Sequence, residues 1–265
     1  MKTTIIVQAR MGSSRFPGKI LKPILGEPVL FRQLERIRKA TSFDNLVVAT
    51  TTRPDDDVIA EECKKRNYDV YRGSNENLLD RHFKAAQLYD TESVVKIPSD
   101  CPLIDPQVID RVIGYYQHKR FKYDFVSNLH PQSYPDGNDV EIMSLDVLEN
   151  AWKHAEKNFE LEHTTPYIWD NPDKFRIGNV LWEKGIDLSK SHRFTIDYVE
   201  DYEFINRVYE ELYPSYPDFS LNDILDLLSQ KPEIMQINAK YTGVNWYRNH
   251  LDDLNTINEN DTKVI

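Results

Sequence analysis

The sequence predicts an α/β protein with a Rossmann-like three-layer α/β/α fold built on a mostly parallel sheet. Short β-branched apolar segments alternate with longer segments whose apolar residues recur at helical spacing. Several helical segments begin with a proline or with acidic residues in the first turn, which are helix-start signals. Strands that alternate with helices in this way form parallel sheets covered by helices on both faces. A chain of 265 residues suffices for one large domain, with or without a small appendage.

The first half of the chain shows this alternation most clearly. Residues 3–9 are β-branched and apolar, as expected of a buried strand, and Pro28 opens the first helical stretch. Further strands are expected at residues 46–52, 69–71, 93–97 and 123–127. Helices are expected at residues 55–67, 75–89 and 105–118. In such sheets ligands bind at the carboxyl ends of the strands, so the loops that follow the strands are the places to look for a site.

The chain after residue 128 is less regular. Strands are expected at residues 140–143, 175–180 and 193–196, and helices at residues 145–157 and 199–212. Ser220 and Asp223 have the spacing of a capping box, which predicts the start of a last helix. We expect the polar tail from Asn255 onward to fray.

The composition favours a cytoplasmic protein that neither enters a membrane nor binds nucleic acid. No apolar run approaches the roughly 20 residues that span a bilayer. The N-terminal apolar core, residues 5–7, is too short for a secretory signal. Two cysteines, Cys63 and Cys101, are too few for a disulfide framework. A net charge of −10 argues against general nucleic-acid binding.

Positive charge is concentrated at the N-terminus. Residues 1–26 contain five basic residues and no acid, so the rest of the chain carries a net charge of −15. A short cationic segment on an acidic protein favours an anionic partner, and a small polyphosphate is the simplest candidate.

The most informative segment is the loop after the first predicted strand, residues 8–19, which reads Q-A-R-M-G-S-S-R-F-P-G-K. Gly12 lets the backbone turn and approach a ligand closely, and the N–H groups of such a loop can surround an anion. Arg10, Arg15 and Lys19 add positive charge. The loop is not a Walker A motif, because five residues rather than four separate Gly12 from Gly18, and it lacks the G-x-G-x-x-G pattern. An ordinary basic surface loop is the alternative interpretation.

The run Q-A-R-M-G-S-S-R-F-P-G-K-I-L resembles the N-terminal signature of the cytidylyltransferase family. That family includes CMP-KDO synthetases, CMP-sialic acid synthetases and the spore-coat polysaccharide proteins called SpsF, and this version is most similar to the SpsF branch. The resemblance extends to about residue 210. It implies that Arg10, Ser13, Arg15 and Lys19 bind the triphosphate of CTP and that Ala9 and Gly12 also bind the nucleotide. It further implies that Lys19, Arg10 and Arg15 are catalytic. Lys19 would also stabilise the charge that develops on the α-phosphate and on the leaving pyrophosphate.

Two aspartates at strand-to-helix junctions are the candidate Mg²⁺ ligands. Mg²⁺ prefers oxygen ligands and is usually held by one or two carboxylates together with substrate phosphates. Asp100 lies in S-D-C-P-L-I and Asp197 in T-I-D-Y-V-E-D, and both runs resemble family motifs whose aspartates bind Mg²⁺. On residue type alone each could instead be a helix cap, the role we expect for Asp105. Glu200 and Asp201 are expected in a solvated first turn.

The remaining candidates concern the nucleotide and the acceptor. The run R-G-S-N-E-N-L-L-D-R resembles a family element beside the nucleotide, which makes Arg81 a nucleotide contact or, alternatively, a residue on a solvated helix face. Asp136, Asp139 and Glu141 resemble the D-G-x-D-V-E run of the SpsF branch and are expected to hydrogen-bond acceptor hydroxyls. His163 lies in a similar E-H-x-T-P element, where it would orient the acceptor, act as a base, or simply be hydrogen-bonded within the turn.

The resemblance as a whole implies Mg²⁺-dependent transfer of CMP from CTP to a small anionic sugar-like acceptor, with release of pyrophosphate, in surface polysaccharide or glycan precursor synthesis. It also suggests a homodimer. We expect a catalytic nucleotidyltransferase domain at residues 1–215, with an acceptor-binding and dimerisation insertion near residues 128–192, and a C-terminal helical extension and tail at residues 216–265.

Three alternatives stay open at this point. The aromatic stretch at residues 237–247 either packs on the body of the protein or closes over the acceptor. The chain could instead be a nucleotide-sugar-dependent glycosyltransferase of a related α/β fold, although a loop that binds a triphosphate suits a nucleotidyltransferase better. It could also be a non-catalytic nucleotide-binding protein of polysaccharide assembly.

Overall fold

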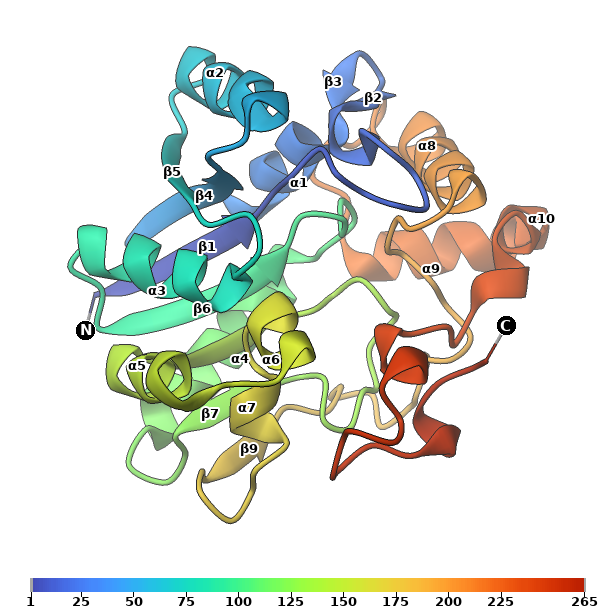
Figure 1. Ribbon diagram of the computed structural model, residues 1–265. Coiled ribbons are helices and arrows are strands. Elements are labelled where there is room, and N and C mark those ends of the chain that lie inside the picture. The colour runs from blue at the N-terminus through green and yellow to red at the C-terminus, as the bar shows by residue number, and fades with distance from the viewer. Residues whose placement is uncertain (1, 265) are drawn as a thin grey trace.

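The computed structural model describes residues 2–264 and shows a central sheet with helices on both of its faces (Figure 1). The strand order is β5–β4–β1–β6–β8–β7–β9. The strands are β1 (Thr3–Gln8), β4 (Asn45–Thr51), β5 (Asp69–Gly73), β6 (Ser93–Pro98), β7 (Phe125–Ser127), β8 (Glu141–Ser144) and β9 (Ile177–Asn179). Within this sheet only β8 is antiparallel to its neighbours, and every other pair is parallel. The predicted, mostly parallel sheet is therefore confirmed.

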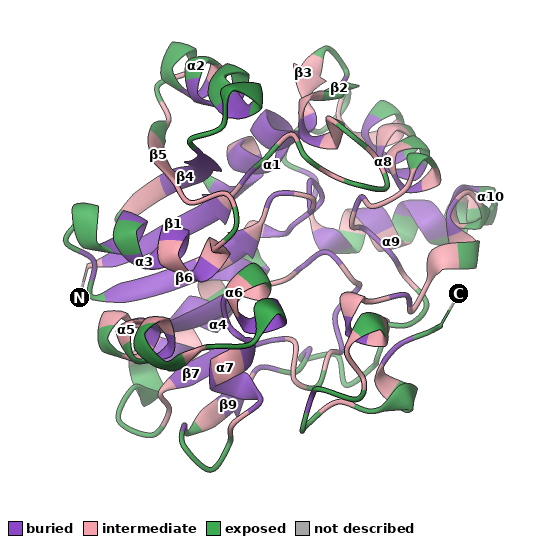
Figure 2. Cartoon of the chain, viewed as in Figure 1, coloured by how far each residue is buried: buried purple, intermediate pink, exposed green. Residues whose placement is uncertain are grey.

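Alternate side chains of β1 enter two different apolar clusters, because successive residues of a strand point to opposite faces of the sheet. Ile5 and Val7 pack in the cluster on one face, and Ile6 packs in the cluster on the other. The first face is covered by α1 (Val29–Ile37), α2 (Asp57–Lys65), α4 (Pro106–Lys119), α8 (Val199–Leu212) and α9 (Leu221–Gln230). The second is covered by α3 (Leu78–Leu88), α5 (Leu145–His154) and α7 (Pro166–Trp169). Burial is concentrated on the strands and on the helix sides that face them (Figure 2), which confirms the three-layer fold.

Shorter elements complete the chain. A two-stranded sheet pairs β2 (Pro23–Ile24) with β3 (Glu27–Pro28). The remaining helices and 3₁₀ turns are η1 (Lys19–Leu21), η2 (Pro54–Asp56), α6 (Asn158–His163), α10 (Pro232–Gln236), η3 (Ala239–Tyr241), η4 (Trp246–Asn249) and η5 (Glu259–Asp261). Across residues 2–264 no helix is both long enough and apolar enough to cross a membrane.

The register of the central strands brings two loops together. β1 lies between β4 and β6, and its last residue, Gln8, is opposite Ala49 and Pro98. The loop after Gln8 and the turn after Pro98 therefore leave the same edge of the sheet, which is the edge where parallel sheets bind ligands. The turn ends at Asp105, whose carboxylate accepts a hydrogen bond from Gln107 N at 2.8 Å and caps α4, as predicted.

The prediction of a strand at residues 193–196 is wrong. This segment forms one isolated bridge, between Arg193 and Asp136, and belongs to no strand of the sheet. Its backbone bonds go to two different loops: Phe194 N donates to Asp136 O at 2.7 Å, and Ile196 N donates to Asp100 O at 2.8 Å. The segment is apolar enough to resemble a strand, but it is a buried connection that ties these loops together.

The C-terminal region also differs from expectation. The capping box of α9 is confirmed, since Ser220 N donates to Asp223 Oδ2 at 2.7 Å and Asp223 N donates to Ser220 Oγ at 3.3 Å. However, α9 is followed by α10 and is not the last helix. The tail is not frayed at its start, because the backbone N–H groups of Asn255 and Thr256 donate to the buried carboxylate of Asp170.

Candidate active site

The basic loop that follows β1, residues 9–18, is held in place at its start by hydrogen bonds to neighbouring segments. Ala9 N donates to Ala49 O at 3.0 Å, which continues the sheet for one residue, and Met11 N donates to the buried carboxylate of Asp56 at 2.7 Å. At the far end Gly18 adopts a left-handed conformation, with φ of 69°, and directs the chain into η1. Arg10, between these anchors, makes one loose ion pair with Glu162, at 3.7 Å.

Lys19, the first residue of η1, lies between the two predicted metal ligands. Its Nζ is 2.7 Å from Asp100 Oδ2 and 3.3 Å from Asp197 Oδ1, and it also donates to the Ile196 carbonyl oxygen. Burial alone would lower the pKa of Lys19, but Asp100 and Asp197 outweigh it and raise the pKa above its ordinary value. Arg15 adds a second cation, with its Nη2 at 2.6 Å from Asp197 Oδ1. Residues from three loops therefore form one charged cluster at the sheet edge.

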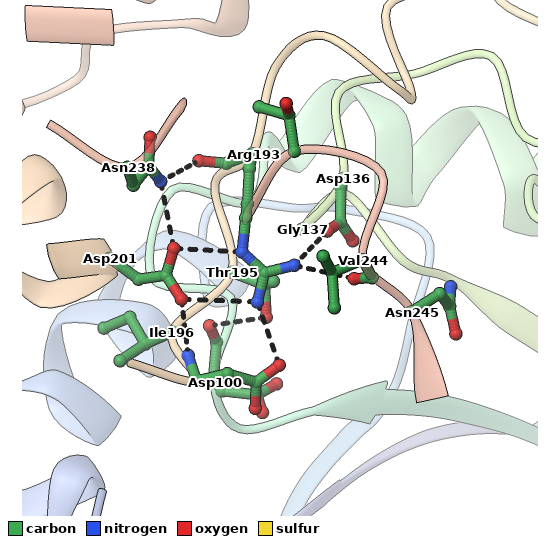
Figure 3. Close-up of polar contacts among 12 residues, drawn as sticks. Asp100, Asp136, Gly137, Arg193, Thr195, Ile196, Asp201, Asn238, Val244 and Asn245 are labelled. Carbon is green, nitrogen blue, oxygen red and sulfur yellow. Dashed lines mark hydrogen bonds and ion pairs between the residues drawn. The ribbon is translucent and has the colours of Figure 1, made fainter. Parts of the chain in front are cut away.

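The side chain of Arg193, which is almost fully buried, borders this cluster. Figure 3 shows its guanidinium bonded to Asp201 on one side and to Asp136 and Val244 on the other. Nε and Nη2 donate to the two oxygens of Asp201 at 2.9 and 3.2 Å. Nη2 also donates to Asp197 Oδ2 at 2.9 Å, and Nη1 donates to Asp136 Oδ2 at 3.1 Å and Val244 O at 2.9 Å. All five guanidinium N–H groups are thus used. Arg193 connects the metal-ligand candidate Asp197 with the acceptor candidate Asp136.

The charges on Arg193, Lys19 and Arg15 determine the protonation of Asp197. Burial would raise the pKa of this carboxyl, but the three cations outweigh burial and hold the pKa well below its ordinary value. Asp197 is therefore a carboxylate at any physiological pH. Asp201, expected in a solvated turn, is instead fully buried. That expectation is wrong because the carboxylate pairs with Arg193 and also accepts from the N–H groups of Asp197 and Tyr198, at 2.9 and 3.0 Å.

Two cavities meet at the charged cluster. The larger, of about 520 Å³, is lined by the basic loop and the start of α3, and the smaller, of about 230 Å³, is lined by β8, the loop before it and the C-terminal segment. Ten of the predicted residues line the larger cavity: Ala9, Arg10, Gly12, Ser13, Arg15, Lys19, Arg81, Asp100, His163 and Asp197. The four predicted acceptor residues line the smaller one: Asp136, Asp139, Glu141 and His163. Arg15, Asp100 and Asp197 belong to both and lie where the cavities join.

Comparison with known proteins identifies the family to which this arrangement belongs. The sequence model described as cytidylyltransferase matches residues 4–225. The chain belongs to the cytidylyltransferase family. The spore coat polysaccharide biosynthesis protein SpsF of Bacillus subtilis is 31% identical over 233 residues, which cover 86% of this chain and 94% of that protein. The 3-deoxy-manno-octulosonate cytidylyltransferase of Zea mays is 43% identical over 144 residues, 52% of this chain and 47% of its own.

A solved cytidylyltransferase structure from Leptospira borgpetersenii serovar Hardjo-bovis is similar over nearly the whole fold. It superposes with a TM-score of 0.84 at 34% identity and covers 89% of this chain and 97% of its own. The predicted resemblance to the family, including its SpsF branch, is confirmed, and so are the nucleotidyltransferase class and fold.

In this member of the family Arg81 is buried rather than exposed, so the alternative of a solvated helix face is wrong. Its Nη1 donates to Ser74 O at 3.0 Å, while Nε has no hydrogen-bond partner among the described residues. Burial and the nearby charge of Arg10 lower the pKa of Arg81 to about 10, which still leaves it a cation at neutral pH. Arg81 lines the larger cavity, so its cation adds positive charge to the wall of that cavity and favours an anionic ligand there.

The carboxylates of the smaller cavity have different partners. Glu141 pairs with Lys96 and accepts from Thr165 Oγ1 at 2.6 Å. Asp136 is held by Arg193, yet its burial outweighs that charge and raises its pKa. Asp139 accepts a hydrogen bond from Gly137 N at 3.2 Å and pairs with no cation among residues 2–264. Burial raises the pKa of Asp139 to about 6. It is the carboxylate of this cavity most available to a ligand.

His163, where α6 ends, stacks on Trp246 with their ring centres 3.8 Å apart. Burial, and to a smaller extent the charge of Lys96, lower the pKa of His163 to about 3. Such an imidazole is neutral and only weakly basic at neutral pH, which favours the orienting role over the role of general base. Both rings line both cavities, so they form a shared wall beside the charged cluster.

The site contains several residues that sequence reasoning missed. In the sequence Arg193 is only the first residue of an expected strand, and nothing in the residues around it signals that it is buried among carboxylates. Of the two alternatives for the C-terminal stretch, packing on the body is confirmed by Tyr247, which is buried in the apolar core. Trp246 lines both cavities, and closure over the acceptor stays a prediction. Gln8, at the carboxyl end of β1, also lines both cavities, and its Oε1 is buried without a partner among residues 2–264.

The carboxylates of Asp100 and Asp197 are arranged to share one cation. Both lie within hydrogen-bonding or ion-pairing distance of the Lys19 ammonium, so their oxygens converge on one point. Across residues 2–264 no group of three or more His, Cys, Asp or Glu side chains could hold a metal ion by itself. Two carboxylates completed by substrate phosphates and water match the way proteins usually bind Mg²⁺. The residues present therefore fit Mg²⁺ delivered with a nucleotide, rather than a permanent metal cage.

Proposed function

We propose that this chain is a Mg²⁺-dependent cytidylyltransferase that transfers CMP from CTP to a small sugar-like acceptor and releases pyrophosphate. The observation that carries the proposal is the junction of the two cavities at Arg15, Asp100 and Asp197. CTP would occupy the larger cavity and the acceptor the smaller one. An acceptor oxygen would then meet the α-phosphorus at the junction, where positioning and charge neutralisation provide most of the catalysis.

The basic loop would bind the triphosphate. Arg10, Arg15 and Lys19 supply positive charge, and the backbone beside Gly12 is open, since a Cβ placed there would meet no atom within 4 Å. Asp100 and Asp197 would hold Mg²⁺, which when bound neutralises phosphate charge and orients the groups for in-line displacement. Arg193 would keep Asp197 fixed through the 2.9 Å bond to its Oδ2, so that the metal ligand is preorganised before substrates bind.

The acceptor cavity favours a hydroxyl-rich molecule. Asp139 has free acceptor capacity, while Asp136 and Glu141 are each held by a cation and keep further lone pairs. Arg248 also lines this cavity, and its guanidinium donates only to Asn245 O and Tyr198 Oη among residues 2–264. A sugar acid would satisfy both features, with hydroxyls on the carboxylates and its acid group towards Arg248. The relative from maize, whose name specifies 3-deoxy-manno-octulosonate as substrate, agrees with an acceptor of this class.

Two further parts of the proposal concern organisation. We propose a catalytic domain at residues 1–215 that is completed by the extension at residues 216–265, because Asn238 and Val244 of the extension bond to Arg193. A homodimer is likewise proposed, on the family resemblance.

The rival glycosyltransferase is less well supported, because a loop with three cations beside the metal ligands suits a triphosphate better than a nucleotide-sugar. A non-catalytic nucleotide-binding role is the second rival, and turnover of CTP would exclude it.

Nucleotide-dependent thermal stabilisation tests the donor. CTP, UTP, GTP and ATP are each added with and without Mg²⁺, and the melting temperature is recorded for the full chain. A ligand at about 100 times its Kd adds about 2.7 kcal/mol, which is readily visible. We expect a Mg²⁺-enhanced shift with CTP that Asp100→Asn reduces. A shift with a nucleotide-sugar and none with any triphosphate would instead support the glycosyltransferase.

A further inference from the structure

Three consecutive aspartates, Asp55, Asp56 and Asp57, lie at the start of α2, and the middle one has different surroundings from the others. Asp55 pairs with Arg53 at 3.1 Å and Asp57 pairs with Arg72 at 2.6 Å, and both aspartates are exposed. Asp56 is 2% exposed and forms no ion pair among residues 2–264. A carboxylate buried without a cation is costly unless hydrogen bonds compensate it, so the partners of Asp56 indicate its role.

The carboxylate of Asp56 does not cap the helix that it precedes. Asp56 occupies the N-cap position of α2, where an aspartate usually accepts a hydrogen bond from the first turn of its own helix, but its side chain makes no such bond. Instead, Oδ1 accepts from Met11 N at 2.7 Å, 45 residues earlier, and Oδ2 accepts from Thr51 Oγ1 at the end of β4. The side chain therefore supports the basic loop rather than α2.

Met11 is the residue through which Asp56 acts on the loop. Its N–H group donates to Asp56, and its carbonyl oxygen accepts from Ser13 N at 2.9 Å and from Gly18 N at 3.1 Å. The bond from Gly18 closes the loop at its base, directly before Lys19. The ammonium of Lys19 lies between the two carboxylates that are the candidate metal ligands. The position of Lys19 therefore depends on a loop base that Asp56 holds in place.

We propose that Asp56 is a positioning residue for the triphosphate, because it fixes Met11 and thereby the loop that carries Arg15 and Lys19. This role rests on the proposed function, in which the triphosphate is the ligand of that loop. Asp56 lines neither of the two cavities that meet at the charged cluster. It therefore acts through the loop and does not touch the substrate.

Charge alone predicts the opposite effect from positioning. Burial and Arg10 lower the pKa of Arg81, and the negative charge of Asp56 partly offsets them, so this charge acts at the wall of the larger cavity. Removing the charge would by itself strengthen the binding of a polyanion in that cavity. If Asp56 positions the loop, losing its contact with Met11 weakens that binding instead. The sign of the change in affinity therefore separates the two explanations.

The test compares Asp56→Ala with Asp56→Asn in the full chain. Asparagine is uncharged but keeps an oxygen that accepts from Met11 N, whereas alanine removes it. The Kd for CTP in the presence of Mg²⁺ is measured by isothermal titration calorimetry. We expect Asp56→Ala to raise this Kd about 10-fold, through loss of a hydrogen bond to a charged group. Asp56→Asn should stay within about 3-fold of wild type. An alanine variant that binds CTP as tightly as the asparagine variant overturns the proposal.

A matched control lies at the other end of β1. Asp44 Oδ2 accepts from Thr3 N at 2.7 Å, and Asp44 lines neither cavity, so Asp44→Ala removes the same kind of contact away from the site. This variant should bind CTP within about 2-fold of wild type. Without ligand, backbone hydrogen exchange at residues 11–18 should be about 10-fold faster in Asp56→Ala and unchanged in Asp44→Ala. Equal exchange in the two variants would show that Asp56 does not fix the loop.

The outcome is separable from that of the proposed function. If the wild-type chain does not bind CTP, the proposed function is rejected, and exchange in the ligand-free chain still decides whether Asp56 fixes the loop. If Asp56→Ala leaves CTP binding unchanged, the positioning role is rejected and cytidylyl transfer stands. If Asp56→Ala does not fold, Asp56→Ser replaces it, because serine can cap α2 while its shorter side chain does not reach Met11 N.

Discussion

Replacing Arg193 with methionine removes the buried centre of the charged cluster while keeping an unbranched apolar side chain of similar length. Arg193 makes four hydrogen bonds to three carboxylates and one to Val244 O, with a side chain that is 1% exposed. Breaking a buried ion pair by removing one partner costs about 3–5 kcal/mol. In the variant, Asp201 still accepts hydrogen bonds from the backbone N–H groups of Asp197 and Tyr198 and from the side-chain amide of Asn238. We therefore expect a cost at the lower end of this range.

We therefore expect Arg193→Met to lower the free energy of unfolding by about 3 kcal/mol, measured by urea denaturation with linear extrapolation. The free energy of unfolding of Arg193→Lys should lie between those of Arg193→Met and wild type, because an ammonium keeps the charge but not the planar arrangement of five donors. Arg248→Met is the matched control, since Arg248 has no carboxylate partner among residues 2–264, and it should cost less than 1 kcal/mol. If Arg193→Met costs no more than this control, the reasoning about the buried cluster is wrong.

Three further predictions concern the cavities. Lys19→Ala and Asp100→Asn should each lower turnover a few hundred-fold, about 3–4 kcal/mol, with an unchanged circular dichroism spectrum; residual activity with a loss of folded protein would contradict this. Asp139→Asn should raise the melting temperature at pH 8 more than at pH 5, because burial raises the pKa of Asp139 from 3.8 to about 6 and its ionisation above that pH destabilises the folded state; a pH-independent difference would contradict it. Trp246→Ala should raise the KM for the acceptor, because it removes the ring stacked on His163. Trp246→Phe keeps an aromatic face and should leave the KM for the acceptor close to the wild-type value.

The fold was largely predictable because its signals are local. β-branched runs mark the parallel strands, and Asp105 and Ser220 mark helix starts through caps that involve residues two or three positions away. Each of these signals depends on near neighbours in the chain. The strand expected at residues 193–196 failed because the same apolar pattern also suits a buried connection, and only the positions of Asp100 and Asp136 determine which one forms.

The location of the candidate site was predictable where a motif marks its residues, and not where burial determines their surroundings. The loop after β1 and the aspartates at positions 100 and 197 were found from residue type, position after strands and resemblance to the family. The fully buried state of Asp201 was missed, because an acidic residue in a first helical turn is usually solvated. Its partner, Arg193, is eight residues away, and their pairing depends on the bend between them. The fixed tail was missed for the same reason, since Asp170 lies 85 residues before Asn255.

Transfer of label from CTP tests the central claim most directly. The chain is incubated with Mg²⁺, a panel of sugar acids and CTP that carries ³²P at either the α- or the γ-position. The account predicts that α-label appears in a CMP–acceptor conjugate while γ-label appears in pyrophosphate in equal amount, and that Asp100→Asn abolishes both. Consumption of a nucleotide-sugar with no consumption of CTP, or CTP binding without transfer to any acceptor of the panel, would contradict it.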